Sequence, residues 1–161
     1  MSDGKKISLA FILVSLLAPL AYGGDQAPTV VFVCEHGSSR SLMAASLFNR
    51  MAEQRGITAR AVSRAASAET VDQKVPDKLA STMAAEGFDV AGFKPQPISA
   101  MEASKAVRVV TLAYDKPLET AATPVERWSD IGSPGREYQK TRDAIASHVD
   151  TLLRELEGER K

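Results

Sequence analysis

The sequence predicts a three-layer α/β/α fold built on a four-stranded parallel sheet. Strand-like and helix-like segments alternate after residue 27, and the first strand-like segment is apolar throughout, as in a strand buried on both faces. The length of 161 residues suffices for one domain with a sizeable core and is too short for two ordinary ones. Strands that alternate with helices require right-handed crossovers, which place helices on both faces of a parallel sheet.

Each expected element rests on a local pattern. β-branched and aromatic residues at 29–33 predict the first strand, and apolar side chains at helical spacing over 40–55 predict the first helix. A short second strand is expected at 59–63, and Pro76 opens a second helix because proline is favoured in the first turn. The remaining expected elements are a short polar helix at 99–105, strands at 107–112 and 125–128, and a closing helix at 137–156 with one apolar stripe.

Residues 1–23 have the three-part layout of a secretory signal peptide. Lys5 and Lys6 form a basic start, an apolar run covers 7–20, and small residues follow at a plausible cleavage site. A membrane span needs about 20 apolar residues, so this run is short for one, and an uncleaved N-terminal anchor is the alternative. We therefore expect export across the inner membrane to the periplasm, and a folded domain at 28–158 without stable membrane contact.

Charge and cysteine content exclude several function classes. The chain has 20 Lys and Arg against 20 Asp and Glu, and without residues 1–23 it has 18 against 19. Such a balance supplies no global field for nucleic acid, so no nucleic-acid partner is expected and any anion binding must be local. The single cysteine excludes an intramolecular disulfide and a Cys-rich zinc site, and neither a metal nor a cofactor is expected. The thiol is either buried and inert or reactive.

The turn between the first predicted strand and helix decides between these alternatives. It lies where parallel sheets bind ligands, and its backbone N–H groups and the helix dipole can attract an oxyanion. The same donors favour the thiolate of Cys34 as a nucleophile, and Arg40 can bind two oxygens of the anion. We predict Cys34 and Arg40 as catalytic residues, with substrate-binding groups from Glu35, His36, Gly37, Ser38, Ser39 and Ser41.

This Cys-x5-Arg-Ser loop, behind a buried strand and followed by a long closing helix, resembles the low-molecular-weight protein tyrosine phosphatase family and its arsenate reductase relatives. The resemblance covers residues 29 to about 156. It implies a flavodoxin-like fold and a two-step reaction in which Cys34 attacks phosphorus while an aspartic acid protonates the leaving oxygen. The same carboxylate then activates water to hydrolyse the cysteinyl-phosphate. The implied substrate is a phosphorylated protein or a small phosphate ester.

The loop departs from the family pattern at two positions. The family usually has Gly-Asn at the second and third positions after the cysteine, where this chain has His36 and Gly37. Gly37 can supply the backbone conformation but not the side-chain hydrogen bonds of asparagine. A protonated His36 would stabilise the Cys34 thiolate, whereas Glu35 would oppose it and disfavour a dianionic substrate unless it points to solvent.

The family's general acid stands in an Asp-Pro pair before the last helix, and this chain contains no such pair. Asp130 is our candidate for the acid. In the alternative alignment Ser133 and Pro134 occupy the place of the pair and leave no acid there, and Asp115 is a reserve candidate. Trp128 either lines the cleft or packs under the last helix, and we favour the second.

Three functions are compatible with the sequence. The preferred one is hydrolysis of a protein tyrosine phosphate or small aryl phosphate through a cysteinyl-phosphate. The second is arsenate reduction, since residues 137–145 resemble the closing helix of thioredoxin-linked reductases, which pass oxidation to further cysteines of their own. With Cys34 alone, that route needs an external thiol. The third is a non-catalytic module that binds oxyanions.

Cleavage after Gly23 predicts a periplasmic form 23 residues shorter than the full chain, because signal peptidase removes the segment after export. Osmotic-shock fractionation followed by N-terminal sequencing measures this directly. A full-length chain in the cytosol would contradict export, and a full-length chain in the membrane fraction would indicate the anchor instead.

Overall fold

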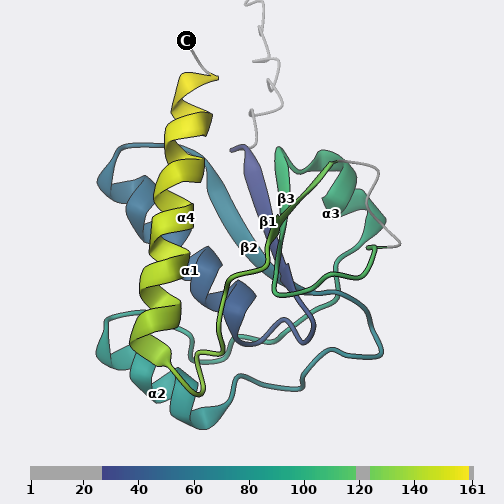
Figure 1. Cartoon of the computed structure of the whole chain (residues 1–161), viewed down its shortest axis with the longest axis vertical. Coiled ribbons are helices and arrows are strands. Elements are labelled where there is room, and N and C mark those ends of the chain that lie inside the picture. Colours follow the sequence, from purple (N-terminus) through teal and green to yellow (C-terminus); the bar gives the residue numbers. More distant parts are fainter. Residues whose placement is uncertain (1–26, 119–123, 160–161) are drawn as a thin grey trace, which may run out of the picture.

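The computed structural model describes residues 27–118 and 124–159 and confirms the predicted fold class: a four-stranded parallel sheet between layers of helices (Figure 1). The predicted signal peptide and its predicted cleavage site lie outside these residues. The elements are β1 (Thr29–Cys34), α1 (Arg40–Gln54), β2 (Arg60–Ala65), α2 (Asp77–Ala85), α3 (Ala100–Lys105), β3 (Arg108–Leu112), β4 (Val125–Trp128) and α4 (Tyr138–Gly158).

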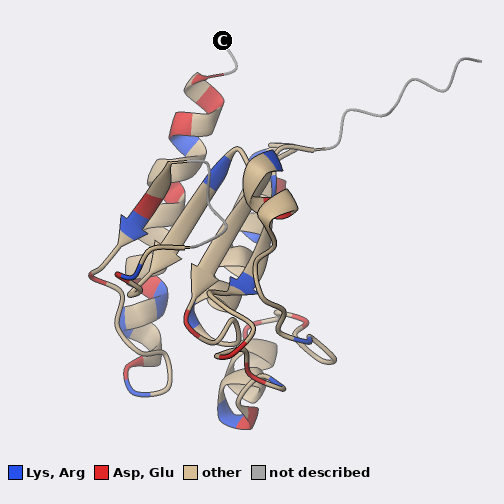
Figure 2. Cartoon of the chain, turned by 90° about the vertical axis from the view of Figure 1, so that its right-hand side faces the viewer, with Lys and Arg blue, Asp and Glu red and all other residues tan. Residues whose placement is uncertain are grey.

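β1 lies inside the sheet, whose order is β2-β1-β3-β4. It pairs with β2 from Thr29 opposite Arg60 to Cys34 opposite Ala65, and with β3 on its other side. Because all the strands are parallel, their carboxyl ends meet at one edge of the sheet, the lower edge in Figure 2. Cys34, the last residue of β1, therefore stands at the edge where such sheets bind ligands.

Helices cover both faces of the sheet, which explains the continuous apolar run of β1. Val30 and Phe32 belong to the larger core, under α1 and α4, whereas Val31 and Val33 point to the smaller core under α3. Figure 1 shows α1 and α4 side by side on one face and α3 on the other. A strand covered in this way needs apolar side chains at both alternating positions.

Trp128, at the end of β4, packs under the closing helix as expected. Its side chain is only 2% exposed. The indole stacks on the imidazole of His148 in α4, with 4.7 Å between ring centroids, and also meets Phe32 of β1 at 5.4 Å. The contact ties α4 to the carboxyl end of β4.

Apart from β4, the elements begin or end one or two residues away from their predicted ranges. The second strand runs from Arg60 to Ala65 rather than over 59–63, because Ala65 continues the ladder opposite Cys34 and its N–H also donates to the carbonyl of Gln96. The second helix begins at Asp77 and ends at Ala85, with Pro76 as its N-cap. The extension of β2 matters for function, because it carries this strand alongside the loop that follows Cys34.

Basic and acidic residues are interspersed along the ribbon in Figure 2. Among residues 27–118 and 124–159, no helix is long and apolar enough to cross a membrane.

The apolar stripe of α4 predicts a large effect of truncating Ile145, which is fully buried in the larger core. Ile145→Ala is expected to lower the free energy of unfolding by about 2–5 kcal/mol, through lost burial and a residual cavity. Urea unfolding monitored by circular dichroism measures the loss. The matched control is Ser147→Ala on the exposed side of the same helix, expected to change stability by less than about 0.5 kcal/mol. Equal effects of the two substitutions would contradict the assigned packing.

Candidate active site

The Cys34 thiol contacts the first of two hydroxyl groups that are hydrogen-bonded to each other, those of Ser41 and Ser63. The residue is 3% exposed, and its Sγ is 3.0 Å from Oγ of Ser41. Ser63 of β2 is 2.8 Å from the same Ser41 hydroxyl and 3.0 Å from the carbonyl of Gly37. When the one proton of Ser63 is donated to Ser41, the proton of Ser41 is free for the sulfur. That arrangement stabilises a thiolate by a charge-assisted hydrogen bond.

Gly37 holds the loop against β2 in a conformation that other residues rarely adopt. Its φ is +72°, and a Cβ at this position would lie 2.6 Å from the backbone nitrogen of Ala65. Both the left-handed backbone and the close approach require glycine. The prediction that Gly37 supplies a backbone conformation is thus explained by this contact.

Arg40 begins α1 and reaches back across the loop toward the segment before α4. Its Nε donates to the carbonyl of Gly132 at 2.7 Å, an interaction that fixes the plane of the guanidinium. The two terminal nitrogens make no hydrogen bond to any residue that the structure describes. A planar pair of N–H donors of this kind suits two oxygens of a bound oxyanion.

A segment after β2 braces the outer side of the loop. The Thr70 hydroxyl donates to the carbonyl of Glu35 at 2.7 Å, and the N–H of Asp72 donates to the carbonyl of His36 at 3.1 Å. The buried hydroxyl of Ser38 donates to the Asp72 carboxylate. These three contacts hold the loop in place from its outer side. Gly37 has no side chain and cannot make such contacts itself.

His36 lies at the rim with a defined tautomer. Its Nδ1 is 2.8 Å from the carbonyl oxygen of Thr70, and because a carbonyl only accepts, Nδ1 carries the proton. Carboxylate oxygens of Glu35 and Asp72 lie 3.9 Å from Nε2 and Nδ1 respectively. The ring is about half exposed, so it is open to solvent and to a ligand at the mouth of the loop.

Asp130, the predicted acid, is held by the closing helix. Both its carboxylate oxygens lie 3.0 Å from Nε2 of His148. The hydrogen bond from His148 holds the pKa of Asp130 below its usual range, so the carboxyl is ionised at neutral pH. This contact opposes a role as proton donor, which stays a prediction. The reserve candidate Asp115 is exposed after β3.

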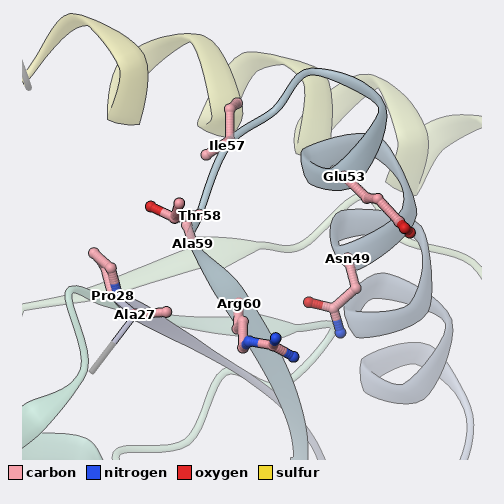
Figure 3. A pocket seen from close by; sticks show the side chains of 8 residues that line it. All are labelled: Ala27, Pro28, Asn49, Glu53, Ile57, Thr58, Ala59 and Arg60. Atoms are coloured by element: carbon pink, nitrogen blue, oxygen red, sulfur yellow. The ribbon is translucent and has the colours of Figure 1, made fainter. Parts of the chain in front are cut away.

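Two cavities differ in their relation to the loop. One of about 310 Å³ adjoins it, lined by Ser39, the first turns of α2 and residues 133–138. A larger one of about 730 Å³ lies at the amino ends of β1 and β2, away from Cys34 (Figure 3). There the Asn49 amide exchanges two hydrogen bonds with the backbone of Ala61, so it braces β2. Within the described ranges no three His, Cys, Asp or Glu side chains could hold a metal ion.

The structure thus brings together every predicted residue of the loop, from Cys34 to Ser41, and leaves Asp130 with α4. Sequence reasoning missed the residues that brace the loop from other segments: Ser63, Thr70, Asp72 and Gly132. Ser63 left a faint signal, as a polar residue that ends the predicted strand directly after Ala61 and Val62.

Comparison with known proteins agrees with this geometry. The family model described as low molecular weight phosphotyrosine protein phosphatase matches residues 29–130, from the first residue of β1 through Asp130. The chain belongs to this family. The match includes the Cys34 loop and Ser63 of β2, which contacts it, and ends before the closing helix α4. No curated protein sequence matches the chain.

Solved structures share the fold of this family member. YfkJ from Bacillus subtilis aligns with a TM-score of 0.71 at 17% identity, over 86% of this chain and all of that one. A low molecular weight protein tyrosine phosphatase from T. tengcongensis aligns at 0.60 and 19%, over 80% and 99%. An arsenate reductase from Archaeoglobus fulgidus aligns at 0.59 and 25%, over 76% and 97%.

The contact between Gly37 and Ala65 predicts that Gly37→Ala abolishes vanadate binding, because the loop must move to admit a Cβ. Isothermal titration with vanadate measures this. Gly56→Ala is the matched control: Gly56 has a φ of +67° but nothing within 4 Å of a Cβ, so it carries only the backbone strain, about 1 kcal/mol. We expect it to keep the affinity of the unaltered protein; unchanged binding by Gly37→Ala would refute the role of the contact.

Proposed function

We propose that the chain hydrolyses phosphomonoesters, of a phosphorylated protein or a small ester, through a cysteinyl-phosphate on the Cys34 loop. The observation that carries the proposal is the contact of the Cys34 sulfur with the Ser41 hydroxyl at the N-terminus of α1. A thiol in that place meets hydrogen-bond donors and the positive end of a helix, both of which favour the nucleophilic thiolate. Membership in the phosphatase family supports the same chemistry.

The loop offers groups for the binding and displacement steps of the proposed reaction, which further needs a proton donor for the leaving oxygen. The loop N–H groups and the terminal nitrogens of Arg40 hold the phosphoryl oxygens and stabilise the charge of the transition state. The Cys34 thiolate attacks phosphorus as the bond to the leaving oxygen breaks. Water then displaces the sulfur and releases phosphate, with the Ser41 hydroxyl donating to the departing thiolate.

Arsenate reduction with an external thiol is the second candidate. It is supported by the likeness to the Archaeoglobus fulgidus arsenate reductase, at 25% identity over 76% of this chain. Arsenate has the shape and charge of phosphate and would enter the same loop. The chain has one cysteine, so it cannot supply the second thiol of a relay. If residues 1–23 direct export, as we propose, the protein meets its substrate in the periplasm.

Cys34→Ser, which keeps the size of the side chain but removes the thiolate, is expected to reduce hydrolysis of p-nitrophenyl phosphate by at least about 1000-fold. Release of p-nitrophenolate measures turnover, and vanadate should inhibit the unaltered protein. The Ser147→Ala variant, changed far from the loop on α4, serves as the control and should keep full activity. Vanadate binding without any hydrolysis would replace the enzyme with an oxyanion-binding module.

The two enzyme candidates are separated by supplying arsenate with glutathione and measuring arsenite. For a phosphatase we expect no arsenite above the level of Cys34→Ser, together with hydrolysis of p-nitrophenyl phosphate. Cys34-dependent arsenite formation in the absence of phosphate ester hydrolysis would establish the reductase instead.

A further inference from the structure

The proposed phosphatase reaction needs a proton donor for the leaving oxygen, and the acidic side chains before and at the start of α4 are poorly placed to supply it. Asp130 accepts from His148 and is ionised. Glu137 pairs with Lys140 on the next turn of α4. Burial, followed by the charge of Glu86, raises the pKa of Tyr138 to about 12, so its phenol does not exchange a proton near neutral pH. In the alternative alignment, which sets Ser133 and Pro134 against the family's Asp-Pro pair, that place has no acid.

We propose that His36 is the proton donor and acceptor of this reaction, an inference that rests on the proposed phosphatase function. The imidazole belongs to the loop itself, two residues after Cys34, and is about half exposed at its rim. Thr70 orients the ring by accepting the hydrogen bond of Nδ1 at 2.8 Å. Nε2 makes no hydrogen bond to a residue in the described part of the chain. An oriented imidazole with one free nitrogen is the usual arrangement of a general acid and base.

Two carboxylates flank the ring. Glu35 of the loop lies 3.9 Å from Nε2, and Asp72, after β2, lies 3.9 Å from Nδ1. Histidine is the side chain most often used for proton transfer in catalysis. His36, one of the two departures of the loop from the family pattern, thereby acquires a role.

The proton balance closes over the two steps. In the first, the sulfur of Cys34 bonds to phosphorus, the bond from phosphorus to the leaving oxygen breaks, and the imidazolium gives its Nε2 proton to that oxygen. In the second, the neutral Nε2 takes a proton from water, whose oxygen bonds to phosphorus as the bond to sulfur breaks. Thiolate and imidazolium are restored, and inorganic phosphate departs.

The test compares two substrates that differ in their need for a proton. Phenyl phosphate has a poor leaving group and p-nitrophenyl phosphate a good one, so loss of a general acid affects the first more. We expect His36→Asn, which can keep the donor to Thr70, to lower kcat/KM for phenyl phosphate by about 100-fold and for p-nitrophenyl phosphate by less than about 10-fold.

The chain has two histidines, so His148→Asn is the matched control and should keep both rates. Vanadate affinity and thermal unfolding of His36→Asn report on the fold, and His36→Gln serves as a second variant. Equal losses on both substrates, or no loss, would overturn the role of His36, as would a selective loss in Asp130→Asn with none in His36→Asn. An unaltered protein that hydrolyses neither ester would instead remove the phosphatase function and this inference with it.

Discussion

The loop from Cys34 to Ser41 depends above all on the parallel pairing of β1 with β2. That register sets Cys34 opposite Ala65, and the backbone of Ala65 is what Gly37 approaches too closely for any side chain. Two residues earlier on β2, Ser63 reaches both the Gly37 carbonyl and the Ser41 hydroxyl, which in turn meets the sulfur. A shift of β2 by one residue would turn Ser63 to the other face of the sheet and break both contacts.

The sequence was sufficient to predict the strand, the loop and the helix that follow one another from residue 29 to Gln54, because the patterns that specify them are local. The apolar run of β1 is required by two buried faces, and the small residues of the loop are required by the tight path to Arg40. The same holds for Trp128, a large ring placed directly before the final helix, which packs where it was expected.

What the sequence could not predict are contacts between distant segments. Ser38 and Asp72 are 34 residues apart, and Arg40 and Gly132 are 92 apart, so neither pair has a pattern of spacing to reveal it. Asp130 illustrates the opposite difficulty: its position in the chain made it the natural acid, but its partner His148 on α4 holds its pKa below the usual range. A proton donor must first lie within reach of the leaving oxygen, and only then does its pKa matter. The sequence does not give that position.

Because Cys34 is the one cysteine of the chain, its oxidation has a consequence for how long the protein stays active in an oxidising environment. A thiolate that reacts with peroxide becomes a sulfenic acid, which is ordinarily rescued by condensing with a neighbouring thiol. No neighbouring thiol is available here: the residue five positions after Cys34 in the loop is Ser39, and the chain has no second cysteine. Its sulfenate would have to be reduced by a thiol from another molecule before further oxidation to the irreversible sulfinic acid. The lifetime of the activity would then be set by the supply of small thiols around the protein.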